Sequence, residues 1–241
     1  TPGVLTLIAI AAVLAPLICR LTKNKLVSIF TILSLSPLIL GDFNGSELSW
    51  ASRVDSNGLE EWLNRLLLNG TYPILPWLAL STLGAIIAET GEFFETRKKI
   101  IGIGGFIFLI SIVLSYSSGK AWALTEGEAI LTFFPATTFF IFITAMFVLI
   151  AHELLLLNAK TQYIDLSILE ASGRLTLTIY VLHFAILGIA AEYMINQPRL
   201  GILQAFFVTF VHTLVWIPLA NLHQHYCPKF SLEELLRRIS E

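Results

Sequence analysis

Two histidines lie near the middle of long apolar segments, where an ionisable side chain is unusual. Both belong to sets of polar or aromatic residues that recur at helical spacing and would share one helix face. These sets are Thr176, Tyr180 and His183 in one segment, and Thr209, His212 and Trp216 in the next. Ionisable groups are costly inside a membrane and by default face a bundle interior or a cavity. The spacing therefore predicts that the two faces meet in a hydrogen-bonding pocket at membrane depth.

Such a pocket suits proton transfer. An imidazole has an unperturbed pKa of about 6.5 and can serve as a general base. The candidate catalytic residues are Tyr180, His183 and His212, and the candidate substrate-binding residues beside them are Thr176, Thr209 and Trp216. The alternative is that both histidines only hydrogen-bond across the helix bundle and stabilise its packing.

A second cluster has the spacing His223-x-His225-x-Cys227. Histidine and cysteine are good zinc ligands, but alternate residues share one side only in extended backbone. No fourth ligand is evident nearby, and Pro228 favours a segment that simply ends a helix. We therefore expect no metal ion.

The composition is that of a membrane protein. Of the 241 residues, 56% are hydrophobic and 13% are charged, against roughly 45–50% and 25% in soluble domains. The apolar residues form long blocks without charges, which is typical of membrane-spanning helices. This excludes a soluble enzyme, a disordered chain and a coiled coil. The net charge of −2 argues against nucleic acid as a partner. Because of the long apolar blocks, the lipid bilayer is the expected partner.

The pattern predicts an all-α, polytopic membrane helix bundle that forms a single transmembrane domain over residues 1–241. About seven transmembrane helices are expected. Their ranges are Val4–Cys19, Leu26–Leu40, Tyr72–Ala88, Ile100–Tyr116, Ile130–Leu157, Leu175–Ile195 and Gly201–Leu222.

Lysine and arginine accumulate in alternate connections, and such residues favour the cytoplasmic side. One set of connections carries 11 of them: Arg20, Lys23, Lys25, Arg97, Lys98, Lys99, Lys160, Arg174, Lys229, Arg237 and Arg238. The other set carries four: Arg53, Arg65, Lys120 and Arg199. We expect a multi-pass protein of the plasma membrane with its N-terminus outside and its C-terminus in the cytoplasm. An outside N-terminus is natural if further helices precede Thr1, so a complete chain and the C-terminal portion of a longer one both stay open.

Two polar regions carry further expectations. In the extracytoplasmic loop over residues 41–70, the spacing of Leu59, Trp62, Leu63, Leu66 and Leu67 predicts an amphipathic helix in the membrane interface, with Arg65 on its polar face. The basic run at residues 97–99 is interpreted as a solvated linker, and Glu153 as part of a hydrated helix end.

Three segments resemble the YeiB-like group of bacterial and archaeal membrane proteins. They are Asn69–Trp77 (NGTYPILPW), Gly173–His183 (GRLTLTIYVLH) and Phe230–Arg238 (FSLEELLRR). The corresponding patterns in the group are NGTYPxxPW, GRxxLTxYxL and GPLEWLxR, and the resemblance covers roughly residues 72–241. Ser231 and Glu234 stand where the group usually has Pro and Trp. The group is related to heparan-alpha-glucosaminide N-acetyltransferase and, more remotely, to other integral membrane acyltransferases.

The resemblance implies that an acyl group moves from a cytoplasmic thioester, an acyl-CoA-type donor, to an acceptor at or across the membrane. It also implies that Arg174 pairs with a donor phosphate and that Asn69, Tyr72 and Trp77 line the outer mouth. The plain alternatives are an interfacial anchor for Arg174, and a turn with an aromatic belt for the other three. The N-terminal Asp-x-x-Arg-Gly signature of these acetyltransferases has no match in the sequence.

These observations favour a transmembrane acyltransferase-like protein. Two alternatives stay open: an accessory or structural subunit of a larger membrane complex, and a small-solute transporter that uses the same polar faces as a path. A cavity between the histidines and Arg174 would favour the enzyme.

Overall fold

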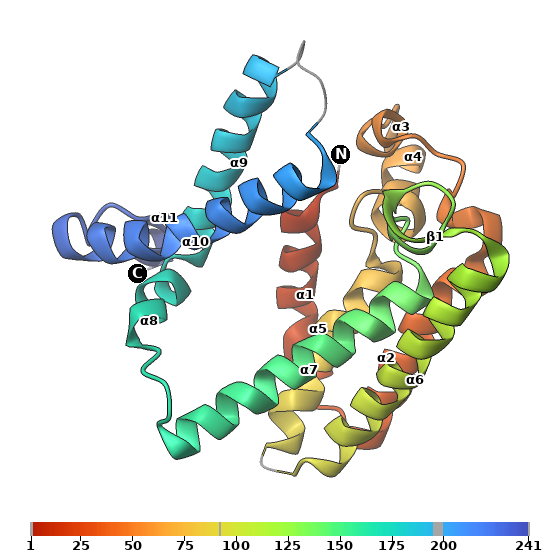
Figure 1. Cartoon of the computed structure of the whole chain (residues 1–241), viewed down its shortest axis with the longest axis horizontal. Helices are drawn as coiled ribbons and strands as arrows, with labels where there is room; N and C mark the ends of the chain where they lie inside the picture. The colour runs from red at the N-terminus through yellow and green to blue at the C-terminus, as the bar shows by residue number, and fades with distance from the viewer. Residues whose placement is uncertain (1, 92, 195–199, 241) are drawn as a thin grey trace. The chain divides into compact units, whose positions relative to one another are not determined.

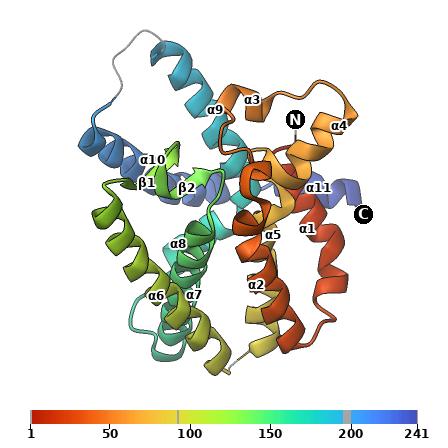
Figure 2. The same ribbon diagram turned by 90° about the vertical axis from the view of Figure 1, so that its right-hand side faces the viewer.

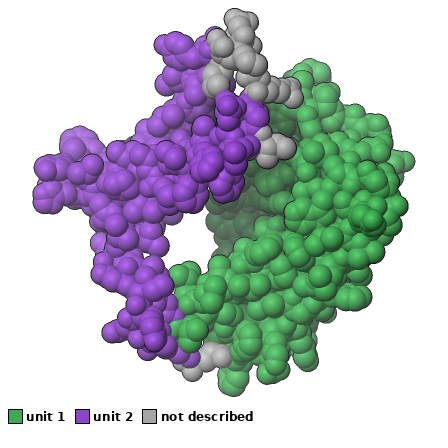
Figure 3. All heavy atoms as spheres, viewed as in Figure 1, with its two compact units in different colours: residues 1–157 green, residues 158–241 purple. Residues whose placement is uncertain are grey.

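The structure, a computed structural model, describes residues 2–91, 93–194 and 200–240 (Figure 1). Helices dominate these residues, and the strands described form one two-stranded sheet. The predicted class, an all-α membrane helix protein, is confirmed. The chain divides into two compact units, residues 1–157 and 158–241, which Figure 3 distinguishes by colour.

Among the described residues, five helices are long and apolar enough to cross a membrane: Lys23–Asn44, Glu95–Ser118, Thr138–Thr161, Thr176–Tyr193 and Leu203–Tyr226. A sixth span results if Leu59–Asn69 and Ile74–Thr90, which are bent by 50° at their junction, count as one. The N-terminal helix, Val4–Ile18, has 15 residues, fewer than the roughly 17 that a span needs. The structure thus supports five or six of the seven predicted spans by length. Ile195 and Arg199, which entered the predictions, lie outside the described residues.

The first unit is built from α1 (Val4–Ile18), α2 (Lys23–Leu40), η1 (Gly41–Asn44), α3 (Trp50–Val54), α4 (Leu59–Asn64), η2 (Arg65–Asn69), α5 (Ile74–Thr90), α6 (Glu95–Ser118), β1 (Ala121–Glu126), β2 (Ala129–Phe134) and most of α7 (Thr138–Thr161). Helix α2 lies along α5 (Figures 1 and 2). Their contact surface is apolar: Phe30, Leu83 and Ile86 are essentially inaccessible to solvent. The ring of Phe30 meets Phe142 of α7 edge-on, with centroids 5.7 Å apart.

Helices α6 and α7 approach each other closely at Gly104. A Cβ atom built on Gly104 would lie 2.6 Å from Cβ of Met146 and 3.0 Å from the carbonyl oxygen of Phe142. Only a residue without a side chain fits at that distance, so glycine is needed for the close packing of this helix pair.

A buried arginine joins three helices of the first unit. Arg97 near the start of α6 is 1% exposed, and its Nε donates to Oε1 of Glu153 in α7 over 2.5 Å. Its Nη1 donates to Thr90 Oγ1 and to the Gly91 carbonyl at the end of α5, both over 2.8 Å. The interpretation of residues 97–99 as a solvated linker is therefore wrong for Arg97, and Glu153 is not a freely hydrated helix end. The reason is that a buried guanidinium needs hydrogen-bond acceptors, and Glu153, Thr90 and Gly91 supply them.

The predicted span Ile130–Leu157 begins differently from the prediction. Residues 129–134 form strand β2, and the helix begins only at Thr138. Pro135 disfavours helical backbone at Phe134, and the β-branched and aromatic residues of β2 favour a strand. Each paired residue of β1 lies opposite the residue eight positions later in β2, in parallel orientation.

The predicted amphipathic helix is present as α4 followed by the π-helical turn η2, but its burial is not as predicted. Arg65, expected on the polar face, is 6% exposed, whereas Leu59 is 73% exposed. Arg65 is satisfied locally by the Asn69 side chain over 2.9 Å and by Glu61 over 2.5 Å. A second arginine, Arg53 of α3, donates to the carbonyl oxygens of Asn69 and Gly45. Two buried arginines therefore organise this loop.

The second unit consists of the last residues of α7 together with α8 (Ser167–Arg174), α9 (Thr176–Met194), α10 (Ile202–Tyr226) and α11 (Leu232–Ser240). Helix α8 packs on α10, and α11 on α9. Its buried apolar core is small, namely Ala171, Leu175 and Ala220. Most apolar side chains of α9 and α10 are exposed, as expected of helices that contact lipid.

Replacing Arg97 by alanine should strongly destabilise the first unit. The substitution leaves the Glu153 carboxylate without its guanidinium partner, and breaking a buried pair costs about 3–5 kcal/mol. The side chain of Glu153 is 24% exposed, which places the loss at the lower end of that range. We expect a loss of that size in the free energy of unfolding of the detergent-solubilised protein, followed by circular dichroism. The control is Lys98→Ala, since Lys98 is an exposed neighbour. Equal effects of both substitutions would contradict the assigned role of Arg97.

Candidate functional site

The two mid-span histidines lie close together in the second unit. His183 on α9 and His212 on α10 have ring centroids 6.2 Å apart and planes inclined by 54°. The ring of Tyr180 lies edge-on to His183 with centroids 5.4 Å apart, and Trp216 lies edge-on to His212 at 5.9 Å. The structure thus brings together four of the six residues predicted to form this pocket.

Hydrogen bonds distinguish the two imidazoles. His183 Nδ1 lies 3.2 Å from the carbonyl oxygen of Ile179. A carbonyl only accepts, so Nδ1 carries the proton and Nε2 keeps a free lone pair in the neutral ring. The indole N–H of Trp216 donates to His212 Nε2 over 3.5 Å, which places the proton of neutral His212 on Nδ1. Of the two rings, His183 therefore has the more available base.

The two threonines predicted for the same pocket make no hydrogen bond to the histidine pair among the described residues. Thr176 and Thr209 are both exposed, and the backbone carbonyl of Thr209 accepts from the hydroxyl of Thr213 over 2.8 Å. Thr176 is the first residue of α9, where the chain has just left α8. Their place in the pocket and their predicted contact with substrate therefore stay predictions.

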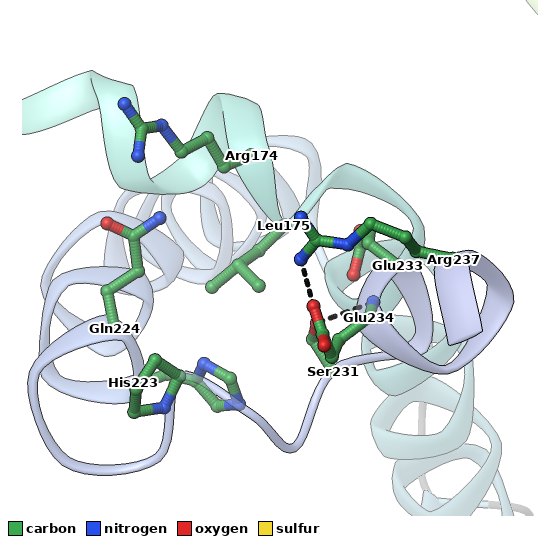
Figure 4. A pocket seen from close by; sticks show the side chains of 9 residues that line it. Arg174, Leu175, His223, Gln224, Ser231, Glu233, Glu234 and Arg237 are labelled. Carbon is green, nitrogen blue, oxygen red and sulfur yellow. Dashed lines mark hydrogen bonds and ion pairs between the residues drawn. The ribbon is translucent and has the colours of Figure 1, made fainter. Parts of the chain in front are cut away.

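A polar cavity of about 560 Å³ lies at the Thr176 end of α9 (Figure 4). Its volume is within the range of small-molecule sites. It is lined by Arg174, Leu175, His223, Gln224, Pro228, Ser231, Glu233, Glu234 and Arg237. Figure 4 shows Arg174 and Gln224 on one side and Ser231, Glu234 and Arg237 on the other. Arg174, predicted to contact a donor phosphate, therefore lines a cavity. Of the other lining residues, His223 was considered only as a metal ligand, and none was predicted as part of this site.

Both carboxylates of the cavity are already engaged. Glu234 pairs with Arg237 and, over 3.1 Å, with Arg238. Arg174 pairs with Glu170 on the same helix, and both side chains are more than half exposed. An exposed pair of this kind contributes little to stability, so Arg174 can exchange Glu170 for a ligand anion at small cost. The cavity can therefore present the Arg174 guanidinium to a phosphate. The second guanidinium of the lining, that of Arg237, is paired with Glu234.

Glu233 joins α11 to the beginning of α9. Its Oε1 accepts from the backbone amides of Leu177 and Thr178 over 2.7 and 3.0 Å, and its Oε2 from the Thr178 hydroxyl over 2.5 Å. The Thr178 hydroxyl accepts in turn from the Leu232 amide over 2.9 Å. A carboxylate from another helix thus satisfies amides that the first turn of α9 leaves unpaired. Burial by itself would raise the pKa of Glu233, but the bonds from Thr178 and Leu177 outweigh it and hold that pKa below its ordinary value.

His223 is the residue of the His-x-His-x-Cys cluster that lines the cavity. Its Nε2 lies 2.8 Å from the Phe230 carbonyl and so carries the proton. Its Nδ1 is buried and has no hydrogen-bond partner among the described residues. His225 and Cys227 are exposed. No group of three metal-ligating side chains is assembled within the described part of the chain.

The residues predicted for the outer mouth belong to the first unit. Asn69 is bound through its side chain to Arg65, and through its carbonyl to Arg53. Tyr72 and Trp77 pack on each other with ring centroids 5.0 Å apart, and Trp77 is 8% exposed. Both rings continue into an aromatic cluster with Phe133, Phe134 and Phe140. Their substrate-binding role stays a prediction.

The Glu233 contact should make stability depend on pH. A carboxylate whose pKa is lowered by folding stabilises the folded state above its unfolded pKa, and this contribution is lost as the pH falls through the folded pKa. We expect Glu233→Gln to lower the melting temperature at pH 7. The difference from wild type should persist at pH 4.5 and vanish only at lower pH, because the folded pKa lies below that ordinary value. Thermal melts at several pH values measure this, with exposed Glu95→Gln as the control; a difference independent of pH would contradict it.

Residues 2–102 match the family model described as heparan-alpha-glucosaminide N-acetyltransferase, catalytic. The match runs from α1 into the beginning of α6, so it includes Asn69, Tyr72 and Trp77 but not the histidine pair or the cavity. No curated protein and no solved structure gives a significant match. The likeness of the later segments to the YeiB-like group stays a prediction. Over residues 2–102 the chain is thus similar to the catalytic part of heparan-alpha-glucosaminide N-acetyltransferase, a membrane acyltransferase.

Proposed function

We propose that the chain acts in acyl transfer at the membrane, with an acyl-CoA-type thioester as donor. The observation that carries the proposal is the combination, within one unit, of a histidine pair and a cavity lined by two arginines. The family match over residues 2–102 supports the reaction class. Such a site must bind the phosphates of the donor and must transfer a proton at the thioester. In the second unit, the cavity is suited to the first task and the histidine pair to the second.

The donor's phosphates would bind in the cavity. Arg174 and Arg237 offer planar donor sets suited to phosphate oxygens. The buried Nδ1 of His223 is an acceptor without a partner among the described residues. An amide N–H of a pantetheine arm would donate a hydrogen bond to it. Thr176 and His183 are seven residues apart on α9, or about 10 Å at 1.5 Å per residue. A pantetheine arm is long enough to cover this separation.

The histidine pair would carry the proton. Nε2 of His183 removes a proton from the acceptor's hydroxyl or amine as that atom attacks the thioester carbonyl. The C–S bond then breaks, the acyl group stays on the acceptor, and the thiolate leaves with the proton returned by the imidazolium. His212, with its ring 6.2 Å away and held by Trp216, would stabilise or relay that charge. Tyr180, packed on His183, would fix the orientation of the ring.

The proposal includes an orientation. The C-terminus and the two-arginine cavity would face the cytoplasm of a plasma-membrane protein, where acyl-CoA is available. The excess of lysine and arginine in one set of connections supports this. The acceptor would approach from the membrane or from its far side.

One observation favours a transporter as a second candidate. Taken as one span, the helical segments Leu59–Asn69 and Ile74–Thr90 are bent by 50°, and Leu75 has non-helical backbone angles. Broken spans often hold substrate or ions in secondary transporters. Uptake of a labelled solute by proteoliposomes, without release of free thiol from acetyl-CoA, would support this candidate.

Replacing either cavity arginine should weaken the binding of a donor that carries phosphates and leave the binding of a donor without them unchanged. Losing a hydrogen bond to a charged group costs about 1.5–3 kcal/mol, so Arg174→Ala and Arg237→Ala should each weaken acetyl-CoA binding about 10- to 100-fold. Binding of S-acetylpantetheine, which lacks the nucleotide phosphates, should be unchanged. Calorimetry on the detergent-solubilised protein measures both ligands, with exposed Arg20→Ala as the matched control. Equal weakening of both ligands would contradict the phosphate assignment.

Replacing His183 by alanine should remove the base without removing donor binding. We expect thiol release from acetyl-CoA to fall at least about 100-fold, with the acetyl-CoA dissociation constant unchanged. His212→Ala should have a smaller effect, because its Nε2 is already engaged by Trp216. Wild-type turnover in the His183 variant would show that the pair serves packing only.

A further inference from the structure

A second cavity of the same unit differs from the first in chemistry. It has a volume of about 540 Å³ and is lined by Thr178, Val181, Leu182, His223, Lys229, Phe230, Ser231, Leu232, Leu235 and Arg238. His223 and Ser231 line both cavities, so the two are neighbours. The lining of the second includes no carboxylate, whereas Glu233 and Glu234 line the first.

The walls of this cavity are apolar and open. Leu182 on α9 is 47% exposed, Leu235 on α11 is 52% exposed, and Phe230 is 82% exposed. Helix α9 is one of the candidate membrane spans. An apolar groove that begins on a spanning helix and continues onto α11 is suited to a hydrocarbon chain.

Two cations stand at this groove. Lys229 makes no ion pair among the described residues. Arg238 shares Glu234 with Arg237 and remains more than half exposed. The lining includes two cations and no acidic side chain, and Arg238 shares the carboxylate of Glu234 with Arg237, so positive charge is in excess beside a hydrocarbon surface. This charge complements an anionic amphiphile and not a zwitterionic one.

We propose that the groove binds an anionic phospholipid of the surrounding bilayer, with the headgroup phosphate between Lys229 and Arg238 and one acyl chain along Leu182 and Leu235. This goes beyond the proposed acyl transfer and does not depend on it, since the lipid binds without reacting. Because Leu232 and Thr178 also line the groove and bond to each other over 2.9 Å, a bound lipid would hold α11 against α9.

The test is native mass spectrometry of the full chain in neutral detergent, titrated with phosphatidylglycerol or with phosphatidylcholine of the same acyl chains, and without any acyl-CoA. We expect phosphatidylglycerol to bind about 10- to 30-fold more tightly than phosphatidylcholine, because each of the two basic residues should contribute a gain of roughly fivefold. The double variant Lys229→Ala/Arg238→Ala should lose this preference. The matched control, Lys98→Ala/Lys99→Ala, removes two exposed basic residues of the first unit and should keep it.

Two further measurements separate the lipid from other ligands. Leu182→Asn should weaken both lipids, because it removes part of the hydrocarbon wall, while melting curves check that the variants fold. Millimolar inorganic phosphate should not displace phosphatidylglycerol. Displacement by phosphate would mean that the occupant is a soluble anion, and an unchanged lipid preference in the Lys229→Ala/Arg238→Ala variant would equally overturn the proposal.

Discussion

The structure depends on one constraint: a polar group removed from water must find its partners inside the protein. Arg97 illustrates it, because its guanidinium is almost wholly buried yet bonded to Glu153, Thr90 and the Gly91 carbonyl. In an apolar chain, few other interactions fix how the helices are oriented, because contacts between hydrocarbon side chains have similar energies in many helix arrangements. An ion pair between a buried arginine and a partly buried glutamate, with two further hydrogen bonds, specifies which ends of α5, α6 and α7 come together.

The second unit applies the same constraint at its helix ends. It has few buried apolar residues, and Glu233 supplies the acceptors that the first turn of α9 lacks. The same segment, residues 228–238, contributes to both cavities. The contact that orders α11 therefore also shapes the region to which we assign donor phosphates and the groove to which we assign a lipid. Structure and proposed binding share one set of side chains here.

Local periodicity predicted much of this arrangement. Long apolar blocks indicated the helices, and helical spacing placed His183 and His212 on faces that do meet. Contacts between residues far apart in the sequence were not predictable in this way. Arg97 and Glu153 are separated by 56 residues, and Glu233 and Thr178 by 55. Charged and hydroxyl residues such as these are common on protein surfaces. The sequence around each of them does not indicate that it has a distant partner. Strand β2 was missed because an apolar run before proline has the hydropathy of a helix.

The bond between Thr178 and Glu233 also fixes the rotation of α9, the helix that carries His183, about its own axis. Five positions separate Thr178 from His183, and each position of an α-helix turns the chain by about 100°. Adding or deleting a single residue between them would therefore swing the imidazole roughly a quarter of a revolution away from His212. This short stretch of α9 can exchange one apolar side chain for another, but its length cannot change while both ends stay engaged.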